Sequence, residues 1–162
     1  MKRNMITAAY IVLIASILVT SCSSSELPSP ISIDNEYLNH QIFVRAPSDS
    51  NTFNTQDVIY LEIKYNSTNK IVFPNNYNLR IFENTLKKWI EIKEKPMTRI
   101  PAGDIILSPE KMLPAVQGVY VSPALPDPGK KYSLRIYVIG QMEANGQSIS
   151  VAAYTDVILR PK

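Results

Sequence analysis

Apolar and polar residues alternate along much of this chain with a period of two. In one such run, Ile59, Leu61 and Ile63 fall on one side of an extended strand, and Glu62 and Lys64 fall on the other. This period is that of a β-strand with one buried face, whereas an amphipathic helix repeats every ~3.6 residues. The 12 prolines, scattered along the chain, also argue against a helical architecture. The chain is therefore predicted to be all-β.

Turn signals divide the chain into many short strands. Clusters of Asn and Ser at 66–69, Pro and Gly at 123–129 and Asn-Gly at 145–146 are the clearest turns. Such spacing favours a single antiparallel β-sandwich of about seven to nine strands over residues 31–162. The clearest extended runs are 58–65, 70–73, 77–82, 89–93, 105–107, 116–121, 132–139 and 149–159, with a loop over 84–87 between the third and the fourth, and the segments near 31 and 42–44 are the further candidates.

The N-terminus has the pattern of a targeting segment. Lys2 and Arg3 precede an uncharged, mostly apolar run over residues 6–19, and small residues then lead to Cys22. A bilayer-spanning helix needs about 20 apolar residues, so this run fits a secretory signal peptide better. Cys22 is the only cysteine, which excludes an intramolecular disulfide.

Val19-Thr20-Ser21-Cys22 resembles the lipobox of bacterial lipoproteins. The resemblance implies that signal peptidase cuts between Ser21 and Cys22 and that Cys22 carries a thioether-linked diacylglycerol. Residues 1–21 would then be a removed signal peptide. An ordinary signal peptide or an uncleaved anchor, with an incidental cysteine, is the alternative.

After Cys22, residues 22–30 are rich in Ser and Pro and are predicted to be a short tether to the domain. The implied lipid would anchor an exported protein to a membrane. In a two-membrane bacterium, Ser23 resembles the sorting signal for the outer membrane. In a single-membrane bacterium the protein would sit on the outer face of the cell membrane.

Asp127-Pro128-Gly129 followed by Tyr132 and an alternating strand resembles a corner of immunoglobulin-like and fibronectin-III-like sandwiches. In those families the Tyr hydroxyl bonds back to the backbone across the corner. The hairpin around Trp89 looks like the middle strands of bacterial immunoglobulin-like domains. A weaker resemblance is to the intracellular proteinase inhibitor sandwiches of bacteria. These resemblances imply a fold only, because such sandwiches have many functions.

Composition and motifs point away from catalysis. One His and one Cys cannot build a Cys/His zinc site. Nucleophile-elbow, phosphate-loop and H-E-x-x-H motifs are lacking. His40 is interpreted as a surface residue, and residues 34–36 as a solvated loop rather than a calcium site. We expect no catalytic residues, no metal and no cofactor. Removing Lys2 and Arg3 leaves 15 − 14 = +1, which gives no basis for nucleic-acid binding.

Lys87, Lys88 and Trp89 are the candidate binding residues. The lysines give the predicted hairpin a basic flank, while Trp89 either fills the core or presents a binding surface. The predicted function is a lipid-anchored, non-enzymatic binding or accessory module of the cell envelope. Its partners would be the membrane, through the lipid, and an envelope protein or glycan. An alternative is a protease inhibitor that uses an exposed loop at 96–103 or 109–118, and an atypical hydrolase is a third.

Overall fold

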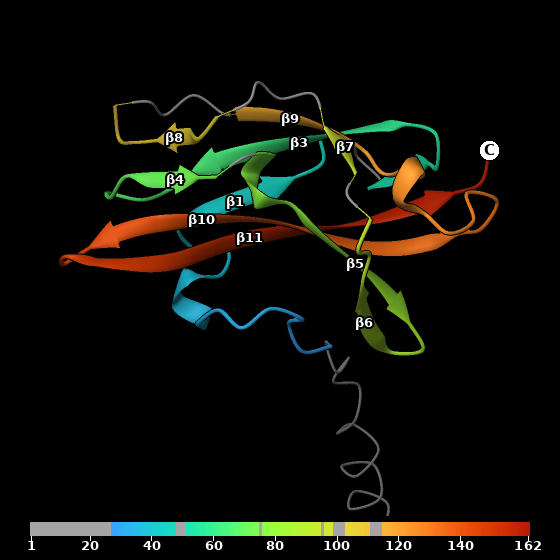
Figure 1. Cartoon of the computed structure of the whole chain (residues 1–162), viewed down its shortest axis with the longest axis horizontal. Coiled ribbons are helices and arrows are strands. Elements are labelled where there is room, and N and C mark those ends of the chain that lie inside the picture. Colours follow the sequence, from blue (N-terminus) through green and yellow to red (C-terminus); the bar gives the residue numbers. More distant parts are fainter. Residues whose placement is uncertain (1–26, 48–50, 75, 95, 99–102, 111–114) are drawn as a thin grey trace, which may run out of the picture.

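The computed structural model describes residues 27–47, 51–74, 76–94, 96–98, 103–110 and 115–162 (Figure 1). Within these ranges the chain forms eleven strands and three short 3-10 turns, with no α-helix. The all-β prediction is therefore confirmed. The elements are η1(Asn35–Tyr37), β1(Ile42–Arg45), β2(Thr52–Asn54), β3(Val58–Tyr65), β4(Ile71–Phe73), η2(Asn76–Asn78), β5(Arg80–Thr85), β6(Lys88–Glu91), β7(Met97–Thr98), β8(Ile105–Leu107), β9(Ala115–Tyr120), η3(Ser122–Ala124), β10(Tyr132–Ala144) and β11(Gln147–Arg160).

The strands form two sheets that enclose a common core, as expected for a β-sandwich. The smaller sheet has the order β1-β3-β9-β7, and the larger has the order β2-β11-β10-β4-β8, with β5 and β6 attached beside β10. Ile59 and Leu61 of the small sheet pack with Leu134 and Ile136 of the large sheet, and all four are fully buried. The described strands exceed the predicted seven to nine because two short strands, β2 and β7, were not foreseen, whereas the strand predicted near Ile31 is wrong because the chain bends there.

Pairing is antiparallel in both sheets except at one edge. There β2 runs parallel to the end of β11, with Ile158 opposite Thr52. The long β10–β11 hairpin turns at Asn145 and Gly146, whose φ angles of 53° and 74° match the turn that an Asn-Gly pair favours. The hairpin predicted at this position is confirmed.

The strand predicted over residues 77–82 begins later, at Arg80. Tyr77 lies instead in the η2 turn with a φ of 56°, where it is buried and its ring lies 5.1 Å from that of Phe73. At its other end β5 extends past residue 82, enters the predicted 84–87 loop and ends at Thr85. Leu86 and Lys87 then make a two-residue turn with positive φ angles, and Thr85 pairs with Lys88.

Both faces of β10 are buried, whereas the sequence pattern predicted only one. Residues 134–140 are all buried, and Tyr137 and Ile139 point away from the main core. They form a second apolar cluster with Ile31, Phe82 and Ala152. This cluster exists because the chain from 27 to 39, here called the N-terminal strap, lies across the outer face of the large sheet.

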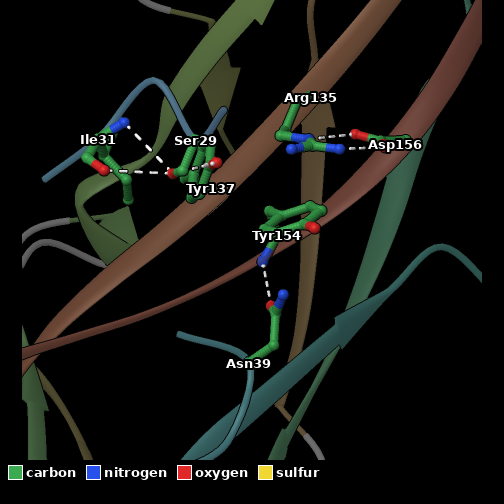
Figure 2. Close-up of polar contacts among 7 residues, drawn as sticks. All are labelled: Ser29, Ile31, Asn39, Arg135, Tyr137, Tyr154 and Asp156. Carbon is green, nitrogen blue, oxygen red and sulfur yellow. Dashed lines mark hydrogen bonds and ion pairs between the residues drawn. The ribbon is translucent and has the colours of Figure 1, made fainter. Parts of the chain in front are cut away.

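The N-terminal strap is fixed to the large sheet at its far end by backbone pairing. The Asn39 N–H donates to the Ala152 carbonyl at 2.8 Å, and the Tyr154 N–H donates to the Asn39 side-chain oxygen at 3.0 Å (Figure 2). Leu38 also forms a parallel bridge with Ala152. The strap therefore packs on the outer face of the large sheet and covers it.

Candidate functional site

A cleft separates the start of the N-terminal strap from the β5–β6 hairpin, with a volume of about 490 Å³. It brings all three predicted binding residues, Lys87, Lys88 and Trp89, beside the strap. The full lining is Leu27, Pro28, Ser29, Pro30, Arg80, Phe82, Lys87, Lys88, Trp89 and Glu91. The last four residues of the predicted tether thus form one wall of the cleft.

Hydrogen bonds and apolar contacts fix that wall to the sheet. The Ser29 hydroxyl lies 3.0 Å from the hydroxyl of Tyr137, a fully buried residue of β10 (Figure 2). The same Ser29 hydroxyl donates to the Ile31 carbonyl at 3.2 Å, and the Ile31 side chain is buried in the second cluster. The strap is therefore held in place immediately after the residues that line the cleft.

Trp89 is half-buried, and its ring packs against the guanidinium of the buried Arg135. The guanidinium of Arg135 lies 4.6 Å from the centroid of the indole ring and 3.9 Å from that of Tyr154. Such contacts stabilise a cation through the electron-rich ring faces. The indole Nε1 is buried and has no hydrogen-bond partner among the described residues. Trp89 thus packs against the second cluster and also lines the cleft.

Arg135 is held charged by a partner at the surface. Its Nε and Nη2 donate to the two carboxylate oxygens of Asp156, each at 2.7 Å, in a bidentate pair (Figure 2). Burial by itself would lower the pKa of Arg135, but the hydrogen bonds and charge of Asp156 outweigh it and raise the pKa. Arg135, against which Trp89 packs, is therefore always positively charged.

A second ion pair crosses the hairpin. Arg80 donates from Nε and Nη2 to the carboxylate of Glu91 at 2.6 and 2.7 Å, and its guanidinium lies 5.2 Å from the Phe82 ring centroid. The hydrogen bond from Arg80 lowers the pKa of Glu91, so this carboxylate stays ionised and paired. Lys87 and Lys88 are exposed and form no ion pair with any described residue.

This combination suits a ligand that has both an apolar part and a negative charge. Phe82, Trp89 and the prolines of the strap supply apolar and aromatic surface, and the two lysines supply positive charge at the rim. Sequence patterns singled out only the hairpin residues. The strap residues were missed because nothing local in a Ser-Pro segment indicates that it docks on a sheet.

A smaller hollow of about 300 Å³ lies on the outer face of the small sheet. Three of its residues come from the candidate inhibitor loops: Met97 and Thr98, which form strand β7, and Gly118, which lies in strand β9. Its floor is Gly118, where the absence of a side chain leaves space beside Val58 and Tyr60. The lining is Gln56, Val58, Met97, Thr98, Gly118 and Tyr120.

The remaining predicted positions are not gathered into a site. His40 is exposed, and its carbonyl accepts a bond from the Asn66 side chain at 3.1 Å. No group of three or more His, Cys, Asp or Glu residues within the described ranges could hold a metal ion. Ser21 and Cys22 lie outside the described residues, as do 99–102 and 111–114 of the two candidate inhibitor loops. In the described part of the chain, no helix is long and apolar enough to cross a bilayer.

The corner at residues 127–132 has the hydrogen bond that its resemblance implied. The Tyr132 hydroxyl donates to the Asp127 carbonyl at 2.8 Å and accepts from the Asp127 N–H at 3.1 Å. The Gly129 N–H donates to the Asp127 carboxylate at 3.0 Å, which lowers the pKa of Asp127. The tyrosine therefore closes the turn that leads into β10.

Comparisons with protein-family models, curated proteins and solved structures gave no match to this chain.

Proposed function

We propose that this protein is a lipid-anchored, non-enzymatic binding module of the cell envelope, with its ligand site in the cleft between the N-terminal strap and the β5–β6 hairpin. One observation carries the proposal. Leu27, the first described residue, already lines the cleft, and it follows Cys22 by five residues. A lipid on Cys22 would hold the cleft within at most about 18 Å of that residue.

This short reach determines which ligands the cleft meets. A domain held so close to a membrane surface encounters envelope components at high effective concentration. The exposed lysines of the lining favour an anionic envelope component, such as an acidic glycan or an acidic surface of an envelope protein. The proposed location is the outer membrane of a two-membrane bacterium, or otherwise the outer face of the cell membrane.

A binding role fits the state of the one carboxylate in the cleft lining. Glu91 is paired in bidentate fashion with Arg80, and its lowered pKa keeps it ionised. A general acid at neutral pH needs a raised pKa instead. Glu91 is therefore not set up as a general acid, and the exposed Lys87 and Lys88 are the charges left to attract a ligand.

We also propose that the sandwich belongs to the immunoglobulin-like class. The bonds of Tyr132 to Asp127 support this, because they reproduce the tyrosine corner of those sandwiches. The missing inter-sheet cysteine pair separates this chain from antibody domains.

The anchor is tested by replacing Cys22 with serine and following detergent-phase partitioning, with the mass of the N-terminal peptide as the direct readout. Wild type should partition into detergent and carry a diacylglyceryl mass on Cys22, whereas Cys22→Ser should partition into water or keep its signal peptide. Ser24→Ala, which lies outside the lipobox, is the matched control. A Cys22→Ser protein that is cleaved normally and still partitions like wild type would contradict the anchor.

The cleft is tested by crosslinking in intact cells from a photoreactive group placed at Lys88. Wild type should give a reproducible envelope adduct, and Trp89→Ala should reduce it. An adduct that is unchanged by Trp89→Ala would show that the cleft is not the ligand site.

A further inference from the structure

The tip of the β5–β6 hairpin carries a residue that folding does not account for. Leu86 is 92% exposed and has a φ of 52°. Two-residue turns with positive φ favour Asn or Gly, since a larger side chain is strained there. A leucine that is both strained and exposed contributes nothing to the core, so its apolar surface is available to something outside the domain.

The exposed residues around Leu86 include basic and apolar side chains. The tip, defined here as residues 84–90, contains the exposed Lys87 and Lys88 and also Ile90, which is 53% exposed. It has no acidic residue, so it carries a formal charge of +2. Two acids flank the tip: Glu91 is paired with Arg80, and Glu83 lies opposite Ile90 on β5. Exposed aliphatic side chains flanked by lysines and a tryptophan are typical of segments that lie in a membrane interface.

The position of the tip agrees with this composition. Figure 1 shows the hairpin projecting from the sandwich beside the start of the described chain, on the side away from β3 and β9. Lys87 and Lys88 line the same cleft as Leu27, so the end of the chain that leads back to Cys22 lies next to the tip. A membrane that holds Cys22 would therefore lie near the hairpin.

We propose that this tip is a second membrane contact, in which Leu86 enters the interface of an anionic bilayer and Lys87 and Lys88 bind its headgroups. The proposal rests on the proposed lipid anchor for the orientation of the domain. Each lysine near an anionic surface should strengthen binding about fivefold. Burial of Leu86 should add about tenfold. The contact would hold the cleft against the membrane rather than let it swing on the tether.

The sole tryptophan of the chain makes the contact measurable, because Trp89 belongs to the tip. The lipidated protein is reconstituted in vesicles that contain brominated phosphatidylcholine, with or without phosphatidylglycerol, and tryptophan quenching is recorded. We expect quenching that increases with the anionic lipid and falls in Leu86→Ser and in the double variant Lys87→Gln/Lys88→Gln. Val116→Ser, which removes an apolar residue that is 64% exposed on the small sheet, is the control and should leave quenching unchanged.

A second arm separates the hairpin from the anchor. The chain from residue 22 onward, with Cys22→Ser and its fold checked by circular dichroism, is sedimented with anionic or neutral vesicles. It should bind weakly and only to anionic vesicles, and Leu86→Ser should lower that binding about tenfold.

Absence of a lipid mass on wild-type Cys22 would overturn the anchor. Sedimentation of the unlipidated chain would still test whether the hairpin tip binds membranes. No binding by the unlipidated chain, or equal quenching in wild type and tip variants, would overturn the membrane contact. Capture of a protein in place of lipid that is lost in Leu86→Ser would also overturn it, because Leu86 does not line the cleft.

Discussion

Replacing Asp156 with asparagine should destabilise the protein, because it removes the charge that balances a buried arginine. The Arg135 side chain is 5% exposed and that of Asp156 is 52% exposed. Two hydrogen bonds of 2.7 Å join them. In the variant the guanidinium stays against Trp89 and Tyr154, but it faces a neutral amide with one acceptor oxygen in place of two.

The size of the loss lies between two limits. Removing one partner of a fully buried pair costs about 3–5 kcal/mol, because the other charge is left uncompensated. An exposed pair contributes only about 0–1 kcal/mol. Here one partner is buried and the other half-exposed, and the two rings still stabilise the cation, so we expect a loss of about 1–3 kcal/mol.

Replacing the other partner, Arg135, distinguishes the cost of an uncompensated buried charge from a simple loss of contacts. In Arg135→Met the remaining charge, Asp156, is already half-exposed and can be hydrated fully, while the methionine fills apolar space beside the rings. Although Arg135→Met removes more contacts, it should therefore destabilise the protein no more than Asp156→Asn.

Urea unfolding at constant slope, followed by Trp89 fluorescence and by far-ultraviolet circular dichroism, measures both variants. Glu143→Gln, an exposed change on β10, is the control and should stay within about 0.5 kcal/mol of wild type. The reasoning fails if Asp156→Asn also stays within about 0.5 kcal/mol. It also fails if Arg135→Met is clearly the more destabilising of the two.

Two further predictions concern the core and the cleft. Leu134→Ala should cost about 2–5 kcal/mol in urea unfolding, because Leu134 is fully buried in the main core, whereas a loss below about 0.5 kcal/mol would contradict that burial. Because its pKa is lowered in the fold, Glu91 contributes stability above its unfolded pKa and loses that contribution as the pH falls through its folded value. Glu91→Gln should therefore lose up to about 1 kcal/mol at neutral pH and progressively less in acid. A difference that grows on acidification would refute this pH dependence.

Part of the candidate site could be anticipated from local patterns. Lys87, Lys88 and Trp89 stand out as a basic and aromatic cluster, and the structure brings all three to one cleft. The opposite wall could not be anticipated, because Leu27 and Ser29 belong to a segment whose composition is that of a tether. A turn between residues 84 and 87 was predicted, but its tight two-residue form at Leu86 and Lys87 was not, since neither Leu nor Lys is a residue that positive φ angles favour.

The sequence by itself determined the strands and several of their turns. Alternation placed Ile59, Leu61 and Ile63 on the buried face of β3, and Asn145-Gly146 marked the main hairpin. These features follow from the pleat of a strand and from the φ angles of a tight turn. Both are set by residues close together in the chain, so a local pattern is enough to predict them.

Tertiary structure alone decided what covers the outer face of the large sheet. Ser29 meets Tyr137 across 108 positions of sequence, and that docking converts an apparent solvent face of β10 into a second core. Period-two alternation marks two faces of a strand, but it does not say whether a distant segment will cover the second one. The cleft exists only because the strap and the hairpin meet on that covered face, so its shape is a long-range property of the fold.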